Sequence, residues 1–419
     1  MQQKVELLAP AGNFECMVAA IQGGADAVYF GVEQLNMRAR ATMNFVIEDL
    51  PAIAHLCKQH KVRSYLTLNT IIYDHDISMM RHIVNEVKRT GIDAIIAADQ
   101  AVISYAFKKG VEVHISTQAN ITNIETIEFY SHFADVMVLS RELSLNQIKQ
   151  ICKAIEKQQI KGPSGKLVEI EVFAHGALCM AVSGKCHLSL HTQNASANRG
   201  VCVQNCRRRY KVIDLEDGHE LELDNEYIMS AKDLCTINFI DQLLDTGVKV
   251  LKIEGRGKAP DYVKTVTRCY REAIDSYLSN NYTSERVEDW MSRLYNVYNR
   301  GFWGGYYLGR EMGEWADSSG SQALTKKIYI GKATNYYARS GIGEFLIEAY
   351  SVKIGQQVMI IGPTTGVIET TINTLHVNND GAKESAEKGD YCSFETGIQV
   401  RNSDKLYKIV PAKEELSVC

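Results

Sequence analysis

Short apolar runs alternate with amphipathic stretches along the first 280 residues of the chain. Because the runs lack strict apolar–polar alternation, they indicate strands buried on both faces of a parallel sheet. There are eight of them: Val5–Pro10, Ala27–Gly31, Arg63–Asn69, Ala94–Asp99, Glu112–Thr117, Val136–Ser140, Glu169–His175 and Val250–Glu254. The stretches of helical length between them include Asn13–Gly23, Ile47–His60, Ile77–Thr90, Ile124–Phe133 and Leu145–Gln158. The count of eight favours an α/β fold of the (β/α)8 TIM-like barrel type over a doubly wound open sheet.

The alternation breaks between residues 176 and 228, after the seventh apolar run. Beyond the helical segment Asp261–Leu278 and an aromatic, glycine-rich link, the chain changes to short β-type runs separated by Gly and Asn-Asp turns. These runs are Lys327–Gly331, Ile342–Tyr350, Gln357–Ile361, Val367–Leu375, Tyr391–Phe394 and Lys405–Val410. They predict a small all-β barrel or sandwich. We assign residues 1–315 to a TIM-like barrel with a Cys-rich insertion at 176–228, and residues 322–412 to a small C-terminal β-barrel domain.

Composition excludes several classes of protein. Of the 419 residues, 45% are hydrophobic and 23% are charged, which is typical of a folded globular chain and not of a disordered one. The formal net charge of −4 argues against non-specific nucleic-acid binding, so an RNA-related function would depend on local basic patches. No run of 18 apolar residues and no secretory signal pattern is present. We therefore expect a cytoplasmic protein without a membrane span, in which cysteines stay reduced.

Five of the 11 cysteines fall within 57 residues, and this crowding points to a metal or cluster site. They are Cys179, Cys186, Cys202, Cys206 and Cys235. Four thiolates can hold structural zinc or a [4Fe–4S] cluster, and the wide, irregular spacing favours the cluster over a zinc ribbon. Buried free cysteines are the simpler alternative. A cysteine protease that uses His175 or His187 is a third interpretation, although neither spacing resembles a protease motif.

Polar and charged residues follow the predicted strands, at the end of a barrel where active sites form. The candidate catalytic residues are Arg38, Arg40, Gln118, Arg141, Glu142, His175, Glu254 and Arg256. Further basic residues stand beside the cysteines, at Arg199 and 207–209, and around the eighth strand. A basic mouth on a slightly acidic protein would suit a polyanion such as RNA, or a small dicarboxylate metabolite.

Several long motifs resemble the collagenase-like peptidase U family. The longest is Glu171–Cys179 followed by Gly184–Ser189. The others are Glu6–Gly12, Gly24–Gly31, Ser140–Leu143, Asn198–Gly200, Cys206-Arg207 and Lys252–Arg256. Together these motifs extend the resemblance over most of residues 5–310. Many members of that family hydroxylate RNA or quinones, and some carry [4Fe–4S] clusters on four cysteines.

The resemblance implies an enzyme most similar to the prephenate-dependent tRNA uridine-34 hydroxylases, which form 5-hydroxyuridine at the wobble position. It implies a [4Fe–4S] cluster on Cys179, Cys186, Cys202 and Cys235, with Cys206 as the alternative fourth ligand. It also implies prephenate as co-substrate, held by arginines such as Arg38, Arg40 and Arg256.

Three other functions stay open at this point. One is hydroxylation of a 23S rRNA cytidine, because the Ser196–Gly200 run is also similar to that branch of the family. Another is a collagenase-like peptidase, as the family name suggests. The last is a non-catalytic iron–sulfur accessory protein that works with a partner.

Overall fold

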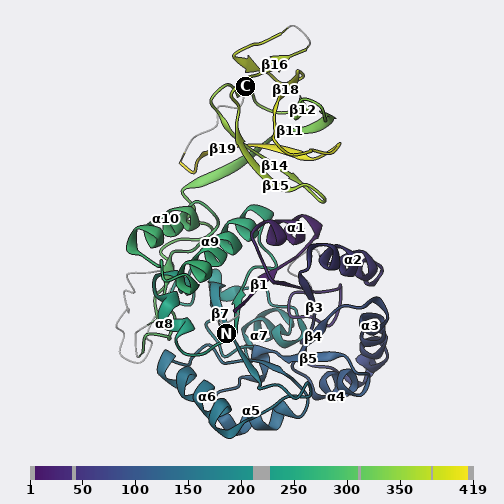
Figure 1. Cartoon of the computed structure of the whole chain (residues 1–419), viewed down its shortest axis with the longest axis vertical. Helices are drawn as coiled ribbons and strands as arrows, with labels where there is room; N and C mark the ends of the chain where they lie inside the picture. The colour runs from purple at the N-terminus through teal and green to yellow at the C-terminus, as the bar shows by residue number, and fades with distance from the viewer. Residues whose placement is uncertain (1–4, 40–43, 211–226, 310–312, 379–380, 414–419) are drawn as a thin grey trace.

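The computed structural model describes residues 5–39, 44–210, 227–309, 313–378 and 381–413. Its larger part is a closed barrel of eight parallel strands (Figure 1). The strands are β1 (Glu6–Pro10), β2 (Ala27–Phe30), β3 (Arg63–Leu68), β4 (Ala94–Ala97), β5 (Glu112–Ile115), β6 (Val136–Val138), β7 (Glu169–Ala177) and β9 (Val250–Ile253). Each pairs in parallel with the next along the chain, and β9 pairs with both β7 and β1. The prediction of a (β/α)8 barrel is confirmed.

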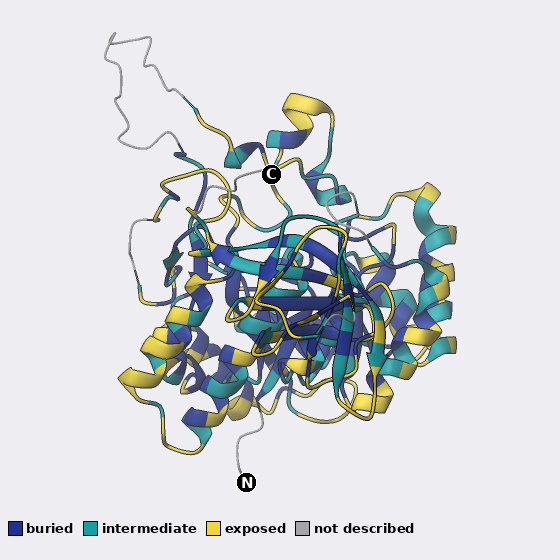
Figure 2. Ribbon diagram, turned by 90° about the horizontal axis from the view of Figure 1, so that it is seen from above, coloured by how far each residue is buried: buried dark blue, intermediate teal, exposed yellow. Residues whose placement is uncertain are grey.

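Helices cover the outside of the barrel, where they form a ring around the strands in Figure 1. They are α1 (Phe14–Gln22), α2 (Leu50–His60), α3 (Ile77–Thr90), α4 (Gln100–Lys108), α5 (Ile124–Ser131), α6 (Leu145–Gln158), α8 (Ile240–Leu244), α9 (Pro260–Leu278) and α10 (Ser284–Tyr295). Local sequence fixes their ends: the side chains of Asn13, Asp99 and Ser144 accept hydrogen bonds from first-turn amides, and Gly91 ends α3 in the left-handed conformation. Figure 2 shows their buried sides facing the strands and their exposed sides facing outward.

Two apolar layers hold the barrel together. One lies between strands and helices and includes Leu7, Ile53, Val84 and Tyr270, whose side chains are fully buried. The other fills the inside of the barrel with Leu8, Ala27, Tyr29, Tyr65, Ala94, Ile96, Val136 and Val250. Because both faces of each strand are buried, the strands carry continuous apolar runs, which is the pattern that identified them.

The amino-terminal end of the barrel is closed by polar side chains that satisfy one another. The hydroxyl of Tyr65 donates to Glu6 at 2.8 Å. Glu112 accepts from Arg63 at 2.7 Å and lies 2.9 Å from Nε2 of His114. Burial acts to raise the pKa of Glu112, but His114 and Arg63 outweigh it and bring that pKa from 4.5 to about 2.

Replacing Glu112 by Gln should therefore destabilise the protein in a pH-dependent way. A carboxylate with a lowered folded-state pKa stabilises the fold above its unfolded-state pKa, and this contribution is lost as the pH falls toward the folded-state value. We expect the variant to be less stable by on the order of 1 kcal/mol at pH 6, a modest value because solvent screens the partly exposed carboxylate. Urea unfolding at pH 6 and pH 3 would measure this; an equal difference at both pH values would contradict the assignment.

The seventh strand is longer than its neighbours and projects past the rim of the barrel. Its last residues pair with the antiparallel strand β8 (Asp233–Cys235), which pairs in turn with β10 (Phe302–Trp303). Between β7 and β8 runs the Cys-rich insertion, which contains the short helix α7 (Leu188–Gln193). Backbone geometry requires glycine at residue 176, because its φ is +106° and a Cβ there would lie 2.4 Å from the carbonyl oxygen of Glu254.

The carboxyl-terminal part is an antiparallel β domain, as predicted. Seven strands form one sheet in the order β15 (Gly366–Thr371), β14 (Gln357–Gly362), β19 (Lys405–Pro411), β11 (Thr325–Tyr337), β12 (Ile342–Ile347), β18 (Tyr391–Glu395) and β16 (His376–Val377). Strands β13 (Val352–Lys353) and β17 (Ser385–Ala386) form a separate pair. Among the described residues, the end strands β15 and β16 do not pair with each other. The core of the domain contains the stacked rings of Phe345 and Phe394.

The β domain is fixed to the outside of the barrel against α1 and α9 (Figure 1). The side-chain amide of Gln22 makes two hydrogen bonds of 2.9 Å, donating to the carbonyl of Thr365 and accepting from the amide of Val367. Lys264 donates to the carbonyl of Val367, and Lys327 pairs with Asp261. The side chains of Met359, Ile361 and Val367 join the apolar layer of the barrel. In the part of the chain that the structure describes, no helix has both the length and the apolar character that a membrane crossing requires.

Candidate functional site

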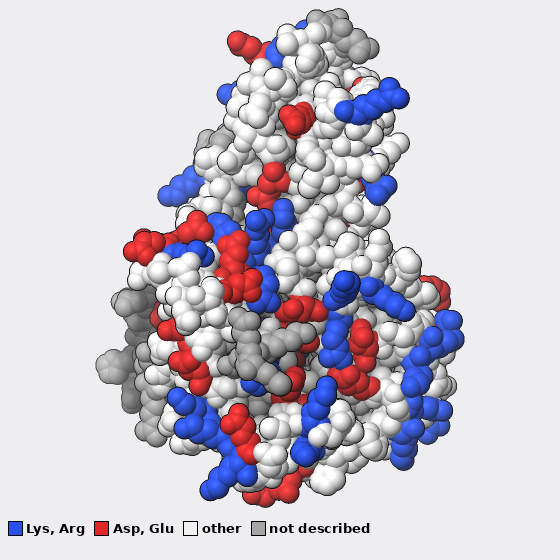
Figure 3. Space-filling model, in the orientation of Figure 1, with Lys and Arg blue, Asp and Glu red and all other residues white. Residues whose placement is uncertain are grey.

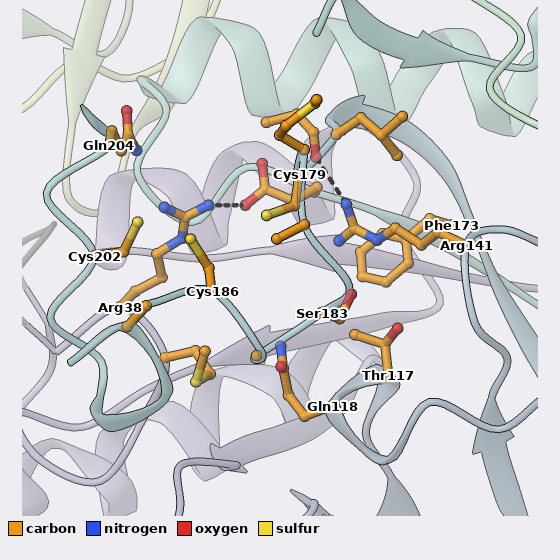
Figure 4. Close-up of a pocket in the computed structure, with 18 of the residues that line it drawn as sticks. Arg38, Thr117, Gln118, Arg141, Phe173, Cys179, Ser183, Cys186, Cys202 and Gln204 are labelled. Atoms are coloured by element: carbon orange, nitrogen blue, oxygen red, sulfur yellow. Dashed lines mark hydrogen bonds and ion pairs between the residues drawn. The ribbon is translucent and has the colours of Figure 1, made fainter. Parts of the chain in front are cut away.

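The carboxyl ends of the barrel strands and the Cys-rich insertion enclose a cavity of about 390 Å³, here called the mouth pocket. Figure 4 shows its arrangement: Arg38 lies beside Cys186 and Cys202, Arg141 lies against the ring of Phe173 on the other side, and Cys179 lies between them. The strands supply its floor and the insertion supplies its wall, so the pocket depends on both. This is the end of a TIM-like barrel at which catalytic sites form.

Four cysteines of the insertion line the mouth pocket: Cys179, Cys186, Cys202 and Cys206. Cys179 is exposed, and the other three are half-buried. Burial raises the pKa of the Cys206 thiol, and the charges of the other three cysteines raise it further, while Arg207 lowers it. All four thiols thus lie on the lining of the same pocket.

The structure does not bring Cys235, the expected fourth ligand, to this group. Cys235 lies in β8, is 4% exposed and does not line the pocket. Its sulfur contacts the hydroxyl of Tyr270 and the sulfur of Met291 on the helix side of the strand. Cys206, the alternative that the sequence left open, lines the pocket with the other three cysteines.

The donor set of the mouth pocket matches an iron–sulfur cluster, which four cysteine thiolates typically hold. As the described residues are arranged, no three His, Cys, Asp or Glu side chains are gathered tightly enough to hold a single metal ion. The thiols therefore share a pocket without converging on one point. The pocket therefore resembles an iron–sulfur site in the type and number of its sulfur ligands, and not in their positions.

Buried cations form the rest of the pocket. Arg38 makes an ion pair of 2.9 Å with Glu254, and this pair, with Lys258 and Arg141, lowers the pKa of Glu254 although burial acts to raise it. Arg300 pairs with Asp233 at 3.2 Å, and Lys252 pairs with Glu171 at 2.6 Å. These three pairs balance their own charges.

Three further arginines of the pocket form no ion pair with a carboxylate among the described residues: Arg141, Arg207 and Arg256. Arg141 donates to the carbonyl of Ala177 at 2.9 Å and stacks 3.8 Å above the Phe173 ring. Its Nε is buried and has no hydrogen-bond partner among the described side chains and backbone groups. Arg256 donates to Asn36 and Thr67, and burial lowers its pKa to about 10. Arg207 donates to the carbonyls of Leu178 and Ala231. The pocket thus has an excess of positive charge that an anionic ligand would neutralise.

Gln118 reaches the pocket from the short 3-10 turn Thr117–Ala119 after β5. Its Oε1 is buried without a hydrogen-bond partner in the described part of the chain. The insertion packs directly on it, because a Cβ at Gly184 would lie 2.1 Å from that oxygen. Gln118 therefore offers an acceptor at the contact between barrel and insertion.

Three of the candidate residues do not reach the pocket or cannot be placed. His175 is buried against Tyr262, Tyr270 and Phe302, because a β-bulge between Phe173 and His175 turns its side chain away from the pocket. Burial lowers its pKa to about 3, so the ring is neutral. Glu142 is exposed and only accepts a hydrogen bond from Ser140. Arg40 lies outside the described residues.

Lys252 and Arg207, which the sequence placed at the basic mouth but not among the candidate catalytic residues, line the pocket, and so does Arg300, which the sequence did not indicate. A signal for Lys252 was present: residues 252, 254 and 256 alternate with a period of two, so their side chains share one face of the strand and its extension. Arg207 was noted only as part of a basic run. Arg300 stands in the glycine-rich link, where nothing in the sequence separates it from a surface residue.

On the molecular face in Figure 3, lysines and arginines are interspersed with acidic residues. The basic residue Arg199, expected at the mouth, is neutralised by an ion pair with Asp76. The arrangement fits a small anion in the pocket better than a broad basic surface.

Comparison with known proteins adds relatives of two kinds. The model of peptidase family U32 matches residues 12–317. A protein of Porphyromonas gingivalis named collagenase is 52% identical over 409 residues, 98% of this chain and 99% of that one. The tRNA hydroxylation protein P1 of Bacillus subtilis is 30% identical over 380 residues, 89% of this chain and 87% of that one.

Two further matches cover less. A 23S rRNA 5-hydroxycytidine synthase of Escherichia coli is 34% identical over 276 residues, which are 66% of this chain and 40% of that one. Among solved structures, a U32 peptidase aligns with a TM-score of 0.37 at 10% identity, over 61% of this chain and 95% of that one.

Proposed function

The chain belongs to peptidase family U32, and from this membership and the chemistry of the mouth pocket we propose that it is an enzyme that hydroxylates a pyrimidine of RNA. The observation that carries the proposal is the combination of four thiols with three arginines that have no carboxylate partner among the described residues. A peptidase needs no such combination. Relatives named for tRNA hydroxylation and for rRNA hydroxycytidine synthesis support the RNA substrate.

The specific reaction is the formation of 5-hydroxyuridine at the wobble position of tRNA, with prephenate as co-metabolite. The tRNA relative aligns over most of both chains, whereas the chain spans less than half of the rRNA enzyme. This difference in coverage favours tRNA over rRNA as the substrate.

Cys179, Cys186, Cys202 and Cys206 would hold a [4Fe–4S] cluster at the wall of the pocket. Such a cluster supplies one-electron transfer when bound. The chain's own residues prepare the place: Arg207 anchors both ends of the insertion through carbonyl groups, and Gly184 lets the loop rest on Gln118.

Arg141 and Arg256 would bind the carboxylates of prephenate, because guanidinium groups form charge-assisted hydrogen bonds to carboxylates in dry surroundings. The Arg38–Glu254 pair would orient the ligand at the side of the pocket nearest Cys202. The rings of Tyr29 and Phe173 would pack against its carbon skeleton.

Peptidase activity on collagen-like chains is the second candidate, favoured by the relative of 52% identity named collagenase. The described part of the chain has no hydrogen bond between a cysteine and a histidine, and His175 faces away from the pocket. Incubation of the purified protein with gelatin, with and without chelator, tests this function. Chelator-sensitive cleavage would replace our proposal.

Deletion of the gene is expected to remove 5-hydroxyuridine from tRNA, as measured by mass spectrometry of tRNA nucleosides. Expression of this chain alone in a strain that lacks other homologues should restore it, which separates an enzyme from an accessory protein. An anaerobic preparation should contain iron and sulfide in equal amounts. Unchanged tRNA modification together with lost hydroxycytidine in rRNA would redirect the proposal to rRNA.

A further inference from the structure

Lys252 lies in an unusual place for a lysine. It is on β9, 5% exposed, and its side chain lines the mouth pocket. Its Nζ is 4.6 Å from the centre of the Tyr29 ring and 5.6 Å from that of Phe173. Lysines are almost never buried to this extent without a specific partner or task. Here the ammonium has one carboxylate partner, Glu171, at 2.6 Å.

The surroundings of this amine make its deprotonation to the nucleophilic form easier than in water. Burial and the nearby charges of Arg256 and Arg141 lower the pKa of Lys252, while Glu171 raises it. Lys252, Arg141 and Arg256 lie against the same two aromatic rings. Arg141 stacks on Phe173, and the Arg256 guanidinium carbon lies 6.0 Å from the centre of the Tyr29 ring. Desolvation beside other cations is how enzymes activate a lysine for attack on a carbonyl group.

Glu171 can accept the proton that such a reaction releases. Its side chain is fully buried, one oxygen accepts from Lys252, and the other has no hydrogen-bond partner among the residues that the structure describes. Transfer of a proton from the ammonium to this carboxylate gives a neutral amine and a neutral acid without moving a charge to solvent. The pair therefore contains its own acid and base.

We propose that Lys252 forms a Schiff base with the carbonyl group of a 2-oxo acid whose carboxylate is held by Arg141 or Arg256. The inference rests on the proposed function and names the chemical class of its small anionic substrate; prephenate itself carries a 2-oxo acid group. Glu171 takes a proton from the ammonium, and Nζ attacks the carbonyl carbon. Glu171 passes this proton to the former carbonyl oxygen and then carries a second proton from the nitrogen to the same oxygen; the C–O bond breaks, and the oxygen leaves as water. The net change is ammonium plus ketone to iminium plus water, with no oxidant or reductant.

The test is reductive trapping on the full chain, purified anaerobically. The protein is incubated with pyruvate or prephenate and sodium cyanoborohydride, and each lysine is then mapped by peptide mass spectrometry. We expect a stable adduct on Lys252, lost in Lys252→Arg and reduced by competing succinate. Lys258→Arg is the matched control, because burial also lowers the pKa of Lys258, to about 8, but its side chain does not line the pocket.

Absence of the adduct from Lys252 with both 2-oxo acids would overturn the proposal, as would equal labelling of Lys258. If Lys252→Arg fails to fold, the position of the adduct in the wild-type protein and in Lys258→Arg still shows whether Lys252 is the reacting lysine. The experiments distinguish a failure of the RNA-hydroxylation proposal from a failure of the Schiff-base proposal. An adduct in a protein whose deletion leaves RNA unchanged would refute RNA hydroxylation alone, and RNA modification without an adduct would refute the Schiff base alone.

Discussion

Replacement of Cys206 by serine is expected to abolish iron binding and RNA hydroxylation together. Cys206 lines the mouth pocket with Cys179, Cys186 and Cys202, and its thiol interacts electrostatically with all three. A serine hydroxyl is a poor ligand for iron at neutral pH, so three thiolates would remain where four are needed. Iron and sulfide analysis of an anaerobic preparation, together with tRNA nucleoside analysis, measures both losses. Serine at any of the other three positions should have the same effect.

Cys235→Ser is the matched control for this prediction. Because Cys235 contacts Tyr270 and Met291 outside the pocket, its replacement should leave iron content and hydroxylation intact and only lower the thermal stability slightly. Cys57→Ser and Cys152→Ser should also keep both properties, since these cysteines are buried in α2 and α6. Full iron content in Cys206→Ser, or loss of iron in Cys235→Ser, would reverse the assignment of the fourth ligand.

Replacement of Arg141 by Gln is expected to weaken prephenate binding by about 10- to 100-fold. A hydrogen bond to a charged group contributes roughly 1.5–3 kcal/mol, and each 1.4 kcal/mol is a factor of ten in affinity. Arg141 has no carboxylate partner among the described residues, so a bound carboxylate would be its first. Isothermal titration calorimetry with prephenate measures the change.

The exposed Arg89→Gln on α3 serves as the control, because Arg89 pairs only with Glu86 on the same helix. It should bind prephenate as the unmodified protein does. Thermal unfolding of both variants separates lost binding from lost folding, since Arg141 also packs on Phe173. Unchanged affinity in a folded Arg141→Gln protein would remove Arg141 from the ligand site.

Much of the fold was predictable because parallel strands buried on both faces leave a continuous apolar trace in the sequence. The eight runs coincide with β1 to β7 and β9, and the polar residues that follow them supplied Arg38, Gln118, Arg141, Glu254 and Arg256 at the pocket. Residues near a strand end are placed by the strand itself, so local pattern was enough for them.

The errors have a different origin. His175 stands at a strand end like the correct candidates, but a one-residue bulge in β7 turns it to the helix side. Periodicity cannot show such a bulge, since its signature is a pairing shift with a distant strand. Cys235 and Cys206 were distinguishable only through the antiparallel pairing of β8 with β7, which fixes the direction of the Cys235 side chain. Both cases depend on contacts between segments far apart in the chain.

Strand β7 extends beyond the rim of the barrel and pairs there with β8, which pairs with β10. The insertion therefore begins and ends on this small sheet, outside the eight-stranded barrel. Both ends of the insertion are held by this small external sheet, where Ala177 pairs with Asp233. Lengthening the segment between them adds a loop-closure entropy cost of only about 0.6 kcal/mol for each doubling of its length. A change in the length of the segment over the pocket could therefore reshape what the pocket admits at a small entropic cost to the eight-stranded scaffold.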